Sequence, residues 1–76
     1  MNAKRRKAIE ELNERITDAK DALEEIKDDE ECYKDNMPEN LQNSSRYETA
    51  ENAVDELEEA ISNLESALEN LESAVE

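Results

Sequence analysis

Two apolar ladders, separated by a turn-rich segment, constrain the fold of this chain more than any other feature. In both ladders the apolar residues recur at alternating intervals of three and four positions, which is the seam pattern of a coiled coil. The first ladder consists of Ile9, Leu12, Ile16, Ala19, Leu23, Ile26 and Tyr33. The second consists of Tyr47, Ala50, Val54, Leu57, Ile61, Leu64, Leu68 and Leu71, with Val75 beyond. If the chain folds back on itself, the rungs pair in order, from Ile9 with Leu71 to Tyr33 with Tyr47. We therefore predict an all-α fold, an antiparallel two-helix coiled-coil hairpin.

The expected hairpin is a single domain over residues 1–76, with helices over about 3–35 and 45–76 and a loop over 36–44. Pro38 disfavours a helical conformation at Met37, so the first helix must end before that residue. Ser45 and Glu48 are spaced as a capping box, which predicts that the second helix starts with Ser45 as its N-cap.

The positions beside the ladders predict how the helices align. With Ile9 at position a of the heptad, position e of the first helix holds Asn13, Lys20, Lys27 and Lys34. Position e of the second helix holds Glu51, Glu58, Glu65 and Glu72. Antiparallel packing brings e against e, so we expect Lys–Glu pairs along one side of the seam, which would set its register. Two further expectations concern the loop end of the seam: Glu30, at position a, bends out to water, and the pair of Tyr33 and Tyr47 closes the end.

Position g carries mostly alanine and predicts an oligomer face. Its alanines are Ala8, Ala22, Ala53, Ala60, Ala67 and Ala74. A helix with a third apolar column is typical of a bundle, so we expect the hairpin to dimerise into a four-helix bundle with two-fold symmetry. The alternative is that alanine occurs there only because it is the best helix former.

Composition limits the partners. The chain has 76 residues, of which 42% are charged and 3% aromatic, and its net charge is −14. Such a charge disfavours direct binding to nucleic acid or to an anionic membrane surface and favours basic protein partners. No apolar run approaches the roughly 20 residues of a membrane span. The basic cluster Lys4–Lys7 is not followed by the apolar segment of a secretory signal. We expect a cytoplasmic protein.

The acidic residues concentrate on the outer positions of the first helix. Six of them form the predicted partner-binding face: Glu10, Glu14, Asp18, Asp21, Glu25 and Asp28. Carboxylates on successive turns recur about every 5.4 Å, a spacing comparable to that of phosphates along a nucleic-acid strand. A basic groove on a nucleic-acid-binding protein would accept such a rod. The alternative is that these acids only keep a thin bundle in solution.

No catalytic, cofactor or metal motif is present, so we do not expect an enzyme. The acidic run Asp28–Glu31 lacks the loop and the glycine of a calcium-binding hand. Cys32 has neither a second cysteine nor a histidine with which to form a metal site. The cluster Lys4–Lys7 and the acids Glu72 and Glu76 each oppose their own helix dipole, and the hairpin would place them together to neutralise each other.

The loop segment Asp35–Gln42, followed by Ser45–Glu48 and leucine-spaced heptads, resembles small acidic proteins encoded by phages and prophages of Gram-positive bacteria. The resemblance extends over the whole chain in length and layout, and the loop is its most distinctive part. It implies a mobile-element context, in which small acidic proteins act against host nucleases or regulators. The expected function is therefore a non-enzymatic inhibitor that mimics nucleic acid, with a structural or assembly module as the alternative.

Overall fold

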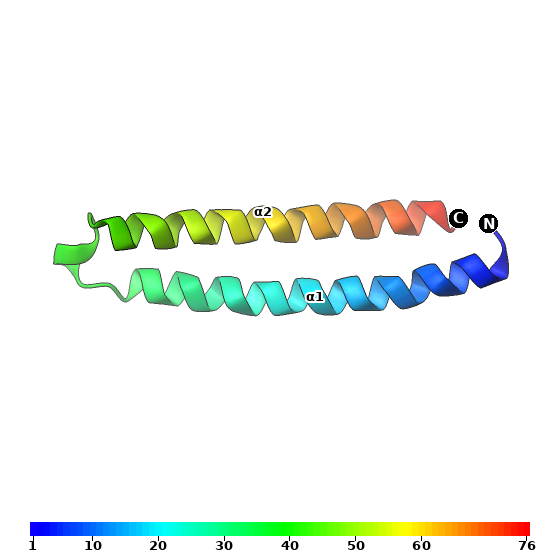
Figure 1. The fold of residues 1–76 in the computed structure, drawn as a ribbon, viewed down its shortest axis with the longest axis horizontal. Coiled ribbons are helices and arrows are strands. Elements are labelled where there is room, and N and C mark those ends of the chain that lie inside the picture. The colour runs from blue at the N-terminus through cyan, green and yellow to red at the C-terminus, as the bar shows by residue number, and fades with distance from the viewer.

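The computed structural model describes residues 1–76 and is a long antiparallel hairpin of two helices (Figure 1). Helix α1 spans Ala3–Asp35, helix α2 spans Ser45–Ala74, and a short 3-10 helix, η1, spans Glu39–Leu41 in the connection. The molecule measures 59 × 15 × 12 Å, and both termini lie at the end opposite the loop. The predicted all-α hairpin is confirmed.

The start of α2 differs from the prediction by one residue. Ser44, not Ser45, is the N-cap, and its hydroxyl oxygen accepts a hydrogen bond from the backbone N–H of Tyr47 at 3.4 Å. The same hydroxyl donates to the carbonyl of Leu41, which ties the cap to the end of η1. The predicted capping box was therefore wrong, because Glu48 does not occupy the third position after this cap.

The core is thin and belongs mostly to α2. Only four residues are buried: Met37 in the connection, and Ala50, Val54 and Ile61 in α2. Helix α1 has no buried residue. Helix α1 therefore lies along α2 as a cover that is itself largely exposed to solvent.

The covering helix is turned about its own axis relative to the expected seam. Its half-buried residues along the seam occupy mainly positions a and e: Ile9, Asn13, Ile16, Lys20, Leu23, Lys27, Glu30 and Lys34. The side chains at position d instead face solvent, with Leu12 44% exposed, Ile26 53% and Tyr33 50%. Ala19, at the same position, is also exposed. The prediction that position d of this helix packs in the seam was wrong.

Side-chain size and shape explain the turn of α1. The lysines at position e have long aliphatic stems that can lie along an apolar groove while their ammonium groups stay in water. On α2, the small side chains of Ala53, Ala60 and Ala67 are half-buried, whereas Ala19 and Ala22 of α1 are exposed. Since α1 is the only other long element, it is α1 that covers this alanine column of α2.

No ion pair joins the two helices. The only ion pairs run from the Lys27 ammonium to Asp28 at 3.7 Å and to Glu31 at 3.9 Å, both within α1. The predicted Lys–Glu pairs across the seam were therefore wrong. Glu30, which we expected to turn out to water, is half-buried at the edge of the seam.

The loop end is closed by Met37, not by a pair of tyrosines. Met37 is only 8% exposed, while Tyr33 is half-exposed. The ring of Tyr47 instead lies beneath the Lys34 ammonium, 5.9 Å from the ring centroid. This cation–π contact links α1 to α2 next to the connection.

At the open end, the helix termini are close but not paired. The N- and C-termini approach each other in Figure 1, as the hairpin requires. No ion pair joins the basic cluster Lys4–Lys7 to Glu72 or Glu76, so their mutual neutralisation involves no direct contact and stays a prediction. The start of α1 is capped by Asn2, whose side-chain oxygen accepts from the Arg5 N–H at 2.9 Å.

Candidate interaction surfaces

The acidic face of α1 is fully open to solvent. All six residues predicted to form it are exposed: Glu10, Glu14, Asp18, Asp21, Glu25 and Asp28. Asp28 alone among them takes part in an ion pair, with Lys27. The face thus presents free carboxylates along most of α1. The rotation of α1 about its axis, which exposes position d, also leaves these acidic positions pointing away from α2.

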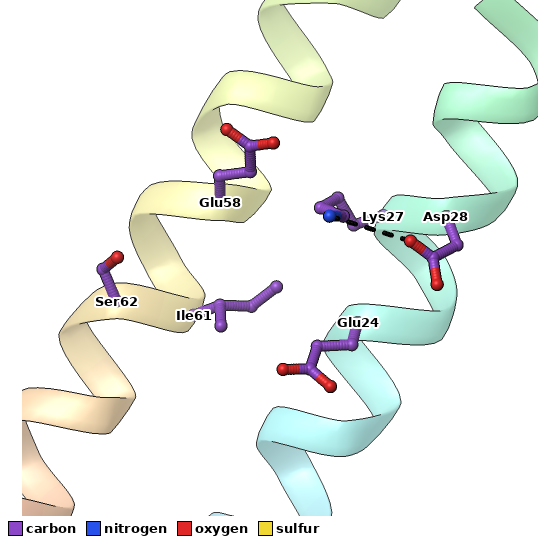
Figure 2. A pocket seen from close by; sticks show the side chains of 6 residues that line it. All are labelled: Glu24, Lys27, Asp28, Glu58, Ile61 and Ser62. Carbon is purple, nitrogen blue, oxygen red and sulfur yellow. Dashed lines mark ion pairs between the residues drawn. The ribbon is translucent and has the colours of Figure 1, made fainter.

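Two acidic residues of α1 that lie beside the acidic face are partly covered. Glu24 and Glu31 are half-buried, because turning α1 toward its lysine column brings the neighbouring column to the seam. Glu24 lines an open groove of about 470 Å³ between the helices, and Lys27 and Glu58 face each other across it (Figure 2). Figure 2 shows the Lys27 ammonium paired with Asp28, on its own helix, and not with Glu58 on α2.

The groove does not form a metal site. Nowhere in the molecule do three or more carboxylate or thiol groups come together in a way that could hold a metal ion. The groove can present charge to a partner. It was not predicted from the sequence, because Lys27 was expected to form an ion pair across the seam.

An apolar column along α1 is the second candidate surface. It consists of Leu12, Ala19, Ile26 and Tyr33, all exposed. Beside it lie Ala8 and Ala22, also exposed, which belong to the predicted oligomer face. The alanines of α2 in the predicted oligomer face differ in exposure: Ala74 is exposed, whereas Ala53, Ala60 and Ala67 are half-buried.

A small pocket at the loop end was not expected from the sequence. It has a volume of about 430 Å³ and is lined by Tyr33, Asn36, Met37, Pro38, Leu41 and Arg46. Met37, one of the lining residues, is buried, whereas Tyr33 and Leu41 remain exposed at the rim of the pocket. The clustering of apolar residues around Pro38 was the available signal, but it did not show which side chain would be buried.

Two further features concern the hydropathy of the helices and the single cysteine. Neither helix contains an apolar stretch that is long enough to cross a lipid bilayer. Cys32 is a free, exposed thiol on α1. The chain matches no protein-family model, no curated protein and no solved structure.

Proposed function

We propose that this protein is a non-enzymatic binding module whose acidic α1 face occupies the basic surface of a nucleic-acid-associated protein. The observation that carries the proposal is the exposure of all six carboxylates of this face, of which only Asp28 has an ion-pair partner. Free carboxylates on a rigid helix provide the regular negative charge that a cationic groove attracts.

The charge distribution favours a binding role over simple solubility. The outer face of α2 dilutes its acids with Asn52, Asn63, Ser66 and Asn70, whereas α1 carries an almost unbroken acidic face. Like charges four residues apart destabilise a helix, so concentrating them on α1 costs stability that an even distribution would avoid. The resemblance to phage-encoded acidic proteins suggests that the partner is a host protein and that the binding inhibits it.

Affinity capture with charge-reversed baits tests this proposal. The first bait is the wild-type chain, the second carries lysine in place of Glu14, Asp18 and Asp21, and the third is a matched control with lysine in place of Asp55, Glu59 and Glu69 of α2. A nuclease-treated bacterial extract supplies the candidate partners. We expect wild type and control to retain a basic protein that duplex DNA or RNA displaces, and the α1-reversed bait to lose it. Retention of that protein by the α1-reversed bait would refute the proposal.

A second function is favoured by a different observation, the exposed apolar column of α1. Three large apolar side chains, Leu12, Ile26 and Tyr33, are exposed along one line of α1, and exposed apolar surface commonly marks an interface between proteins. We therefore propose that the hairpin also assembles as a homodimer, a four-helix bundle. Sedimentation equilibrium of the wild-type chain tests this, with a dimer expected at micromolar concentration and a monomer of 8.7 kDa contradicting it.

A further inference from the structure

The exposed edge of α1 has the dimensions of an interface. We call this edge the α1 edge: Leu12, Ala19, Ile26 and Tyr33 at position d, with Ala8, Arg15, Ala22 and Asp29 in the adjacent g column. All eight side chains are exposed. Its residues from Ala8 to Tyr33 extend about 38 Å along the helix at 1.5 Å per residue.

The total exposed area is large for the mass of the chain. The hairpin exposes 5837 Å², whereas a folded monomer of 8.7 kDa is expected to expose about 4,700 Å². The excess of about 1,100 Å² is comparable to the roughly 800 Å² that each partner buries in a stable protein–protein interface. Burying about 800 Å² per copy would remove most of this excess from each hairpin.

Charge complementarity identifies a second copy as the occupant. Arg15 and Asp29 are the only charged residues of the g column of α1, and neither has an ion-pair partner within the hairpin. Two copies of α1 that pack in antiparallel orientation can place Arg15 of one in the layer next to that of Asp29 of the other, within reach of its long side chain, and the two-fold axis repeats the contact. In a parallel arrangement Arg15 would lie beside the same residue of its partner, which is repulsive.

Knobs-into-holes packing of this edge defines one register. A column of positions d and g is spaced in threes and fours, so antiparallel packing sets each d opposite a g of the partner. The resulting layers are Ala8 with the partner's Tyr33, Leu12 with the partner's Asp29, Arg15 with the partner's Ile26, and Ala19 with the partner's Ala22. Large side chains thus meet small ones at the ends, and alanines meet at the centre, where the helices can approach most closely.

The position of the two-fold axis also suits α2. The axis passes between Ala19 and Ala22 of α1. Because Lys34 lies over Tyr47, two heptads further along the hairpin Lys20 is level with Ile61. The axis is therefore level with Ala60, the middle residue of the alanine column of α2. Ala60 is half-buried beneath α1, so its small side chain lets α1 lie close to α2 at the level of the axis.

We propose that two copies dock through the α1 edge in this antiparallel register, with Arg15 and Asp29 forming the two symmetric contacts that select it. This inference rests on the homodimer of the proposed function and specifies its geometry. The acidic positions Asp18, Glu25 and Asp28 of both copies then lie on one side of the bundle. The dimer would offer a partner two parallel rows of carboxylates rather than one.

A charge-swap experiment on the full chain tests the register. Every variant carries Cys32→Ser, so that the exposed thiol cannot crosslink two copies. The dissociation constant of the dimer is measured by sedimentation equilibrium for Arg15→Glu, for Asp29→Arg and for the double variant, with helicity checked by circular dichroism. Each single change replaces two attractive contacts with two repulsive ones and is expected to raise the dissociation constant about tenfold. The double variant restores both contacts and should return to within about threefold of the parent.

Two controls complete the design. Lys7→Glu and Asp35→Lys change the net charge by the same amounts as the test variants, at exposed positions of α1 that lie away from the edge. They should leave the dissociation constant of the dimer within about threefold of that of the parent. Ile26→Gln removes an apolar contact from the edge and should yield a helical monomer. If the wild-type chain is a monomer, the homodimer and this inference both fail, while binding of a basic protein through the acidic face stands. If the chain dimerises but the double variant is not restored, the register alone is refuted.

Discussion

At the scale of single residues, Asn13 is the one residue with a buried side-chain polar atom that lacks a hydrogen-bond partner. It occupies position e of α1, where the following heptads carry lysines, and its side-chain oxygen is buried without a hydrogen-bond partner. A lysine in this position reaches water with its ammonium group, whereas the amide of asparagine is too short to do so. A buried polar atom that lacks a partner costs about 1–3 kcal/mol.

We predict that Asn13→Ala stabilises the hairpin. Its matched control is Asn52→Ala, because Asn52 is an exposed residue in the interior of α2 and gains the same helix propensity from the change. The free energy of unfolding of Asn13→Ala should exceed that of the control by about 1 kcal/mol, since only the first removes a buried unpaired group. Urea denaturation measures the difference, and equal effects of the two changes would show that the Asn13 amide carries no penalty.

At the scale of elements, the two helices contribute unequally. Helix α2 contains three of the four buried residues, and α1 contains none. Most of the backbone hydrogen bonds, 55 of 64, lie within the helices themselves. Because tertiary burial is so limited, local features such as caps account for a large share of the stability of this fold.

We predict that the start of α2 depends on Ser44. Replacing Ser44 with alanine removes the N-cap acceptor and the link to Leu41, and should cost about 1 kcal/mol of unfolding free energy. The matched control is Ser45→Ala, which should change stability by only a few tenths, because Ser45 is already a helical residue. Thermal unfolding followed by circular dichroism compares the stabilities of the two variants. A larger loss of stability for Ser45→Ala would show that Ser45, as predicted from the sequence, is the N-cap.

The architecture was predictable from the sequence because it depends on strong, repeated signals. Two long heptad ladders and a single proline at position 38 leave few alternatives to a hairpin. The turn of α1 was not predictable, since the assignment treated Lys20, Lys27 and Lys34 as flanking charges. The aliphatic stems of these lysines compete with Leu12 and Ile26 for the groove on α2. A sequence pattern that classes each residue only as apolar or polar counts lysine as polar and misses this apolar surface.

At the scale of the whole molecule, repulsion dominates the electrostatics. The net charge is −14, and the only ion pairs are the two made by Lys27. Within α1, acids stand four residues apart at Glu10 and Glu14, and again at Asp21 and Glu25. Such pairs destabilise a helix, and dissolved salt weakens them.

We predict that the thermal midpoint rises when sodium chloride is increased from about 0.05 M to about 0.5 M, where the Debye length is a few ångströms. The measurement is circular dichroism at one fixed protein concentration, because dimerisation makes the midpoint depend on concentration. A control chain with Glu14→Gln, Asp18→Asn and Asp21→Asn should show a smaller rise. A wild-type midpoint that does not move with salt would contradict this account of the charge.

The candidate site was predictable in part. The six acids of the predicted face are all exposed, because outer heptad positions stay outward over a wide range of helix rotation. The α1 edge and the pocket beside Arg46 were not predictable. Both depend on which of several apolar side chains turns inward, and this is decided by packing between the two helices and the loop.

Whether the acidic face of α1 carries the function is decided by the affinity of a purified basic partner, once captured, for three forms of this chain. Isothermal titration calorimetry compares the wild type, the α1-reversed chain and the α2-reversed control at one salt concentration. If the acidic face of α1 carries the function, reversal on α1 weakens binding at least about a hundredfold, or about 2.7 kcal/mol, while the control stays within about threefold. Equal losses for the two reversed chains would show that net charge alone attracts the partner, and would contradict the claim.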